Sequence, residues 1–369
     1  MTDIIPYIDR KETSKIMRTL KIIAFTAVFS ILTALFCTTV SAESVIAKSK
    51  YDSMTNYLTD SDGNTYCIAY NNGSAGTCYV VCVDKKGKVT ASSKLDSGWM
   101  NIKMKELDDN IYVTYSTVKN YKADKAKCKI YDKSLNLQDT YTLSYVPIKD
   151  TQFYDVNCSK VVYISGRKSI YMCDHNGKNK KKLLSADEIN ADMIQYVALN
   201  GNYAAFSASA GVYGKEKYYY GLINIKTGKI YLKKTISEKA PEVSNDLIAW
   251  YNTNFKFPNK GTGSIIMLKD GKFFKTRTET YNESNYVMGT IDSEGKIITY
   301  EASEEYGAHK IVVRIYDDRK CINKFDVEIS HSQSILGTVN FTADGGVIAF
   351  SYSDNKDGSE VAKTMLIEY

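Results

Sequence analysis

The stretch FTADGGVIAFS, residues 341–351, joins a tight turn to an apolar strand. Asp344-Gly345-Gly346 can adopt the positive φ angles that short hairpins require. The next four residues, Val347-Ile348-Ala349-Phe350, form a short apolar run that ends in an aromatic side chain. Similar runs, most of them preceded by a polar turn, occur at residues 67–70, 111–115, 161–164, 203–206, 247–250, 297–300 and 347–350.

The spacing of these seven runs indicates a repeat. Their last residues are 45, 49, 42, 44, 50 and 50 positions apart, and a second apolar strand closed by another turn follows in most units. A period of about 47 residues without a helical pattern is typical of a four-stranded propeller blade. The sequence therefore predicts an all-β fold, a seven-bladed β-propeller of four-stranded antiparallel blades.

The alternation inside the runs indicates sheets that are buried on both faces. Ile348 and Phe350 share one face of their strand, whereas Ala349 lies on the other. Both faces are apolar, as a sheet between two neighbouring sheets requires. We expect the small residues to leave room for aromatic side chains of the next blade.

The last unit is incomplete, because its third strand, 364–369, is followed by no fourth strand. An open ring would leave an unpaired strand edge. The segment 43–50 precedes the first strand of unit one, and we expect it to pair as the outer strand of the last blade.

The amino terminus predicts export. Five basic residues between Arg10 and Lys21 precede an apolar run at 22–36, and Val40-Ser41-Ala42 supplies small residues for cleavage. An uncleaved anchor over 22–42 is the alternative, because that length can just span a bilayer. In either case residues 43–369, expected to form a single propeller domain, lie outside the cytoplasm, and membrane contact is expected only if 1–42 is retained.

Two segments carry a family resemblance. Residues 341–351 look like the repeats of TolB-type propellers, and 169–180 resemble secreted bacterial YWTD-like propeller repeats. The YWTD tetrapeptide itself is absent, and Ala343 stands where TolB repeats usually carry proline. The resemblance implies the fold and export, and it transfers no functional residue.

Composition argues against several kinds of partner and cofactor. Lys plus Arg exceeds Asp plus Glu by only 48 to 42, spread along the chain, so no nucleic-acid partner is expected. The basic run from Lys178 to Lys182 is expected to lie on a solvated outer strand. The three histidines lack the spacing of metal ligands. The sequence contains no phosphate-binding glycine loop and no Gly-x-Ser-x-Gly motif. We therefore expect neither a metal nor a cofactor.

Seven cysteines remain after residue 42, so they cannot all pair with one another. Cys67 with Cys82, and Cys158 with Cys173, could face each other across hairpins. The alternative, favoured here, is that the cysteines are small buried strand residues.

The connections between second and third strands read as long in five units, and they share one face of the ring. Aromatic side chains on such loops can stack on sugars or anchor a protein partner; the alternative is that they fold back over the blades. The candidate ligand-binding residues are Tyr121, Tyr213, Tyr219, Phe255, Phe257, Tyr306 and His309.

Two functions remain open. The first is an exported non-catalytic module, expected to be a monomer, that binds an unknown protein or carbohydrate ligand through the long-loop face. The alternative is an extracellular carbohydrate-active enzyme with paired carboxylates at the channel mouth. Acids that could pair across blades include Asp150, Asp155, Glu242, Asp292 and Glu304.

Overall fold

The computed structural model describes residues 44–71, 78–95, 99–120, 122–212, 216–235, 250–256, 260–269, 272–281, 286–302, 310–317, 320–328, 333–335, 341–356 and 359–369. The expected signal segment, 1–42, lies outside these residues. Within the described parts of the chain, no helix has the length and apolar character needed to cross a membrane.

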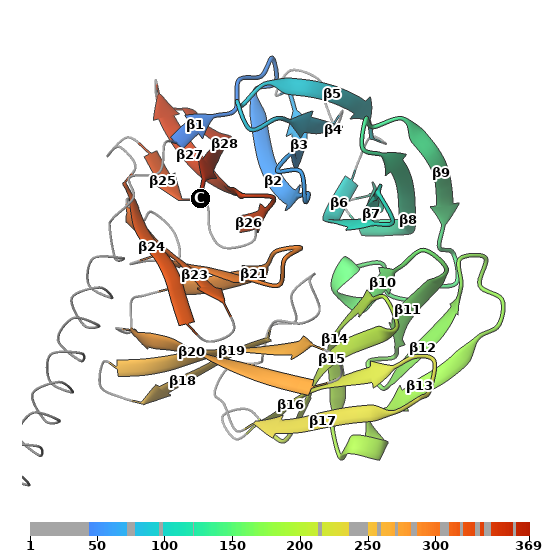
Figure 1. Ribbon diagram of the computed structural model, residues 1–369. Helices are drawn as coiled ribbons and strands as arrows, with labels where there is room; N and C mark the ends of the chain where they lie inside the picture. The colour runs from blue at the N-terminus through green and yellow to red at the C-terminus, as the bar shows by residue number, and fades with distance from the viewer. Residues whose placement is uncertain are drawn as a thin grey trace, which may run out of the picture.

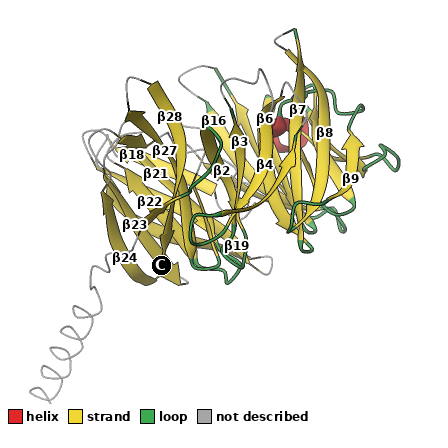
Figure 2. Cartoon of the chain, turned by 90° about the horizontal axis from the view of Figure 1, so that it is seen from above, coloured by secondary structure: helices red, strands yellow, loops and turns green. Residues whose placement is uncertain are grey.

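The described strands form seven antiparallel sheets, arranged as the blades of a β-propeller around a central axis (Figure 1). In blades 1 to 4 and in blade 6 the first strand lies toward the axis and the later ones lie outside it. Figure 2 shows the ring from its edge, with the strands running between its two faces. The all-β propeller predicted from the repeat is therefore confirmed.

Blades 1 to 4 each contain four strands in chain order. Blade 1 has β2 (Ser53–Thr59), β3 (Thr65–Tyr70), β4 (Cys78–Val83) and β5 (Val89–Lys94). Blade 2 has β6 (Trp99–Leu107), β7 (Asn110–Lys119), β8 (Lys122–Asp132) and β9 (Leu137–Thr142). Blade 3 has β10 (Tyr154–Val156), β11 (Lys160–Ser165), β12 (Ser169–Asp174) and β13 (Lys181–Ser185), and two 3-10 turns, η1 (Thr151–Phe153) and η2 (Asp187–Ile189), flank it. Blade 4 has β14 (Met193–Asn200), β15 (Tyr203–Ala210), β16 (Lys217–Asn224) and β17 (Ile230–Thr235).

The remaining sheets complete the ring. The described part of blade 5 has β18 (Trp250–Lys256), β19 (Lys260–Lys269) and β20 (Lys272–Tyr281). Blade 6 has β21 (Tyr286–Ile291), β22 (Ile297–Ala302), β23 (Lys310–Asp317) and β24 (Lys320–Glu328). Blade 7 has β25 (Gln333–Ile335), β26 (Phe341–Asp344), β27 (Val347–Lys356), β28 (Ser359–Glu368) and, as its outer strand, β1 (Ser44–Ile46).

The ring closes as the sequence predicts. Strand β1 pairs with β28 in antiparallel register, with Val45 opposite Leu366. The backbone N–H of Ala47 continues this pairing with the carbonyl of Thr364 at 3.1 Å, and the N–H of Lys48 then bonds the carbonyl of Gly87 in blade 1 at 2.7 Å. The segment at the start of the described chain therefore joins blade 7 to blade 1.

Successive side chains of a strand point to opposite faces of the sheet and so pack against different neighbouring blades. In β3, Tyr66 and Ile68 pack with side chains of blade 2, whereas Cys67 and Ala69 face blade 7. Ala349 of blade 7 meets that same small face of blade 1. The space beside these small side chains is filled by Tyr51, Met54 and Leu366. The aromatic ring that the sequence led us to expect beside Ala349 is therefore that of Tyr51, at the start of blade 1.

One five-residue turn builds many of the hairpins. An aspartate begins it, and its carboxylate Oδ1 accepts a hydrogen bond from the N–H four residues on, at 2.8 Å in 60–64, 2.9 Å in 84–88 and 132–136, and 2.8 Å in 292–296. The fourth residue has positive φ, and it is Gly63, Gly87 or Gly295 in three of these turns and Leu135 in the other. These turns join first to second strands, or third to fourth strands, so all of them lie on one face of the ring, which we name the turn face.

On the opposite face of the ring, the connections between second and third strands in blades 2 and 7 are shorter than the sequence predicts. In blade 2, β7 runs to Lys119 and β8 begins at Lys122, so residues predicted as a long loop extend the hairpin. In blade 7, β27 runs to Lys356 and β28 begins at Ser359. The prediction of long loops in these two units is wrong, because backbone pairing continues through the polar ends of the strands, as far as Lys119 opposite Lys122 and Lys356 opposite Ser359.

None of the seven cysteines in the described parts of the chain forms a disulfide bond. The register places Cys67 opposite Val81 and Cys82 opposite Tyr66. Cys67 and Cys82 therefore point to opposite faces of their sheet and cannot pair. Five of the cysteines are buried, as expected for small strand residues, whereas Cys158 and Cys321 are exposed. The basic run ends in β13, where Lys181 and Lys182 are exposed on the predicted outer strand.

A buried ion cluster links the inner strands of blades 2, 3 and 4. The carboxylate of Asp155 in β10 is fully buried, with Lys105 Nζ at 2.7 Å from Oδ1 and Lys103 Nζ at 3.8 Å from Oδ2. The N–H of Leu199 in β14 also donates to Oδ2, at 2.7 Å. Burial alone would raise the pKa of Asp155, but the two lysines and the hydrogen bonds hold it below its ordinary value.

Closure can be tested by truncation. A chain that starts at residue 49 loses β1 and its backbone hydrogen bonds, whereas one that starts at residue 44 keeps them. We predict a loss of about 2–4 kcal/mol in the free energy of unfolding, because each bond contributes about 1 kcal/mol and an edge is exposed. Equal denaturation midpoints for the two chains would contradict the closure.

Replacing Asp155 tests the ion cluster. Asp155→Asn removes the carboxylate that Lys103 and Lys105 share, so we predict a loss of about 3–5 kcal/mol in the free energy of urea unfolding at pH 7. The exposed Asp139→Asn is the control. Because the folded pKa of Asp155 is lowered, its contribution is present above the unfolded pKa of about 3.9 and is lost as the pH falls through the folded value. A loss no larger than that of the control, or one that persists unchanged at low pH, would show that the cluster does not stabilise the ring.

Candidate functional site

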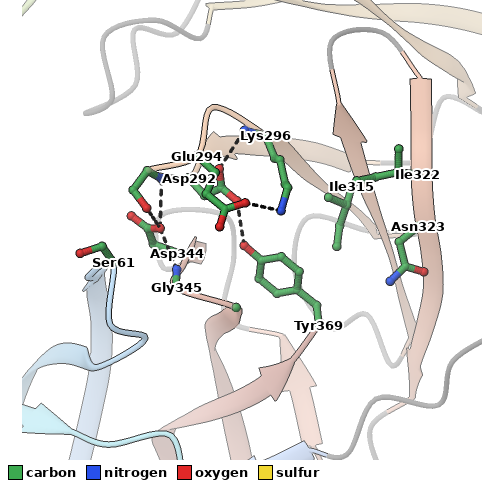
Figure 3. Close-up of a pocket in the computed structure, with 12 residues that line it drawn as sticks. Ser61, Asp292, Glu294, Lys296, Ile315, Ile322, Asn323, Asp344, Gly345 and Tyr369 are labelled. Atoms are coloured by element: carbon green, nitrogen blue, oxygen red, sulfur yellow. Dashed lines mark hydrogen bonds and ion pairs between the residues drawn. The ribbon is translucent and has the colours of Figure 1, made fainter.

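A cavity of about 690 Å³ lies on the turn face, where blades 6, 7 and 1 meet (Figure 3). Its lining comes from the turn after β21, the turn after β26, the turn after β2 and the residue that follows β28. Polar lining residues are Ser61, Asp292, Ser293, Glu294, Lys296, Asn323, Asp344 and Tyr369, and Ile315 and Ile322 add apolar surface. We name this cavity the turn-face pocket.

The five-residue turn of blade 6 fixes the most buried carboxylate of the pocket. The N–H of Lys296 donates to Asp292 Oδ1 at 2.8 Å, and the hydroxyl of Tyr369 donates to Asp292 Oδ2 at 3.1 Å (Figure 3). The turn itself is held by a bond from the N–H of Gly295 to the carbonyl of Asp292 at 2.9 Å. Asp292 is 7% exposed, so its carboxylate has one orientation set by two blades.

A second carboxylate ties the turns of blades 6 and 7 together. Asp344 Oδ1 accepts bonds from the N–H of Ser293 at 3.0 Å, the hydroxyl of Ser293 at 2.7 Å and the N–H of Gly345 at 2.7 Å. These three donors all lie in turns, so the two turns form one rigid wall of the pocket.

The wall continues to blade 1 through two glycines. A Cβ on Gly345 would lie 2.2 Å from the backbone N of Gly63, and φ of Gly345 is +55°. Only glycine permits this approach. Lys85 of blade 1 donates to the carbonyl of Gly345 at 2.8 Å, which fixes the contact between the blades.

The pocket is electrically negative. Three carboxylates, Asp292, Glu294 and Asp344, line it with one ammonium, Lys296, which leaves two net negative charges. Lys296 Nζ pairs with Glu294 Oε2 at 2.5 Å. Burial raises the pKa of Asp292 and the neighbouring Asp344 adds to the rise, while the bonds from Lys296 and Tyr369 oppose it. Burial also raises the pKa of the Tyr369 hydroxyl.

This arrangement fits a ligand that brings a cationic group next to an apolar one. The carboxylates can compensate a positive charge, and the ring of Tyr369 with Ile315 and Ile322 offers apolar contact. Across the described residues, no group of three or more His, Cys, Asp or Glu side chains is placed to hold a metal ion.

The aromatic residues predicted as loop ligands do not form the described site. Tyr219 lies in β16, is 4% exposed and packs in the core between blades 3 and 4, so its prediction as an exposed loop residue is wrong. Its position in a strand covered by the neighbouring blade buries the ring. Phe255 lies in strand β18 rather than in a loop. The other candidates, Tyr121, Tyr213, Phe257, Tyr306 and His309, lie outside the described residues.

Some residues of the turn-face pocket can be recognised as candidates from the sequence alone. Asp292 was among the acids proposed to pair across blades, and Asp344-Gly345-Gly346 was recognised as a turn. Glu294-Gly295-Lys296 is likewise recognisable as a turn. The sequence does not show that Tyr369 joins these turns, because only the closed ring brings blades 6, 7 and 1 together.

Solved structures with similarity to this chain include a β-propeller domain, a WD40 domain and a prolyl endopeptidase. The β-propeller domain of the Trilobed protease from Pyrococcus furiosus has 13% identity over 73% of this chain and 82% of that chain, with a TM-score of 0.43. The WD40 domain of SCAP from fission yeast has 11% identity over 86% of this chain and 82% of that chain, with a TM-score of 0.42. A prolyl endopeptidase has 9% identity over 85% of this chain and 50% of that chain, with a TM-score of 0.46. No family model and no curated protein matches the sequence.

The electrostatics of the pocket can be measured by NMR titration of the Asp292 carboxyl carbon. We predict a pKa above the ordinary value of about 3.9, raised further in Tyr369→Phe and lowered in Asp344→Asn. Because the folded pKa is raised, ionisation of Asp292 costs stability as the pH rises through that window. A pKa at the ordinary value that neither variant moves would contradict this geometry.

Proposed function

We propose that this chain is an exported, non-catalytic binding module, and that its ligand site is the turn-face pocket. The signal-like amino terminus supports export. The observation that carries the binding site is a cavity with two net negative charges whose carboxylates are held rigidly by turns of two blades. Rigid turns on a propeller scaffold present side chains without an ordering cost at binding.

We further propose that the ligand is a protein segment that inserts a lysine or arginine side chain. The long apolar stem of such a side chain suits Ile315, Ile322 and the ring of Tyr369, and its charged end can pair with Glu294, while the buried Asp292 adds to the negative field. Glu294 is the most accessible of these carboxylates, with a side chain that is 69% exposed. Its ion pair with Lys296 can be replaced by an ion pair with the positive charge of the ligand.

Glycoside hydrolysis, the alternative function, finds weaker support in the pocket. An acid catalyst needs a carboxyl group free to meet the glycosidic oxygen. Both oxygens of Asp292 accept hydrogen bonds from the protein, and Oδ1 of Asp344 accepts three. These carboxylates are occupied in holding the turns, so the module is the function that the geometry favours.

A randomised library of short peptides tests the proposal. We predict enrichment of peptides with Lys or Arg beside aliphatic residues, and Glu294→Lys should weaken their binding about tenfold or more, roughly 1.4 kcal/mol, as measured by fluorescence anisotropy. Glu368→Lys, exposed on β28, is the matched control and should bind as the unmodified protein does.

Three results would overturn the proposal. They are enrichment of acidic peptides, binding that Glu294→Lys leaves unchanged, and absence of binding by the whole library. Turnover of a glycan panel that is lost in Asp292→Asn would establish the carbohydrate-active alternative instead.

A further inference from the structure

The turn of blade 3 that joins β12 to β13 carries a dense positive charge. Its exposed lysines are Lys178, Lys180, Lys181 and Lys182. The aspartate that begins this turn, Asp174, is already paired with Lys160 at 2.5 Å. In the described parts of the chain, no acidic side chain forms an ion pair with Lys178 or Lys181. The turn therefore presents positive charge that its own surroundings do not compensate.

The turn is also held in one shape. The N–H of Lys178 donates to Asn176 Oδ1 at 2.9 Å. The turn rests directly on the ring of Tyr145, because a Cβ on Gly177 would lie 2.7 Å from a carbon of that ring, and φ of Gly177 is +80°. A rigid turn of this kind presents its side chains without an ordering cost in its backbone.

Of the four lysines, Lys178 is the one that the turn itself presents. Lys181 and Lys182 belong to strand β13, and the ammonium group of Lys180 lies over the ring of Tyr171, 4.3 Å from its centre. Lys178 is therefore the side chain of this run that is free to enter a cavity of another molecule.

The basic turn and the turn-face pocket lie on the same face of the ring. The turn joins the third strand of blade 3 to the fourth, so it belongs to the turn face. Blade 3 lies across the ring from blades 6 and 7, which carry most of the pocket (Figure 1). One copy of the ring cannot bring the two sites together, whereas two copies with their turn faces opposed can. A twofold axis between them makes the same contact twice.

We propose that a second copy of this chain is a partner of the turn-face pocket. The two copies pack turn face against turn face, and Lys178 of each copy enters the pocket of the other. The stem of this lysine contacts Ile322 and the ring of Tyr369, and its ammonium group pairs with Glu294. Both pockets are then occupied, so assembly stops at two copies. This inference rests on the proposed function of the pocket as a site for a lysine or arginine side chain.

Charge complementarity selects this partner. The pocket has two net negative charges, and the turn that enters it brings a run of lysines. Contacts between exposed charges are screened by salt. We therefore expect a dimer at low ionic strength, and the monomer predicted from the sequence at high ionic strength.

Sedimentation velocity over a range of protein concentrations tests the proposal. Lys178→Glu and Glu294→Lys should each raise the dissociation constant of the dimer about tenfold or more, because each places like charges in contact. The double variant, in which both signs are exchanged, should dimerise again, because each contact regains opposite charges. Lys122→Glu, at an exposed position on the opposite face, makes the same change of charge and should dimerise as the unmodified protein does.

Lys178→Glu should fold, because the bond that holds the turn uses the backbone of Lys178 and not its side chain. A urea midpoint equal to that of the unmodified protein checks this. A protein that stays monomeric up to about 1 mM at low ionic strength would overturn the dimer. A dimer that Lys178→Glu leaves intact, or that an excess of a selected basic peptide does not dissociate, would overturn it too.

The peptide separates this inference from the proposed function. If the unmodified protein binds the peptide through Glu294 but forms no dimer, the dimer is wrong and the function of the pocket stands. If the protein neither binds basic peptides nor dimerises, both proposals are wrong.

Discussion

The antiparallel pairing of β1 with β28 is the constraint on which the ring depends. Each blade is covered on both faces by its neighbours, so the ring as a whole is stable only if its first and last blades meet. Residues 44–48 contact both blades at that junction. They form the outer strand of blade 7, and the N–H of Lys48 donates to the carbonyl of Gly87 in blade 1. The contact of Gly345 with Gly63 and the small-residue interface around Ala69 and Ala349 lie at the same junction.

The turn-face pocket follows from this closure and from the chemistry of short turns. The aspartate that begins a five-residue turn uses its carboxylate to bond the backbone, which makes the turn rigid and places carboxylates on one face of the ring. In blade 6 the same aspartate, Asp292, also accepts a bond from Tyr369 of the last blade. One residue type therefore builds the hairpin and supplies the negative charge of the site.

Much of the fold could be predicted from the sequence, because the period of the apolar runs and the turn residues are local signals. Segment 43–50 was correctly expected to close the last blade, and the turn Glu294-Gly295-Lys296 before residues 297–300 was correctly placed. The candidate site was not predicted, because composition does not distinguish a loop from an extended hairpin. Tyr219 was thus misplaced, and β7 with β8 proved to be longer than expected. The pairing of Lys103 and Lys105 with Asp155, and of Asp292 with Tyr369, joins residues at least 50 positions apart and depends on how the blades meet.

The two faces of the ring thus have different characters: one carries extended hairpins, and the other carries rigid acidic turns around a cavity. We propose that the ligand binds the acidic turns, and hydrogen–deuterium exchange of the protein with and without a selected basic peptide can locate the binding site. We expect the peptide to slow exchange at residues 292–296 and 344–346 and to leave exchange unchanged at the hairpin end joining β7 to β8. Protection confined to the hairpin ends of the opposite face would contradict it.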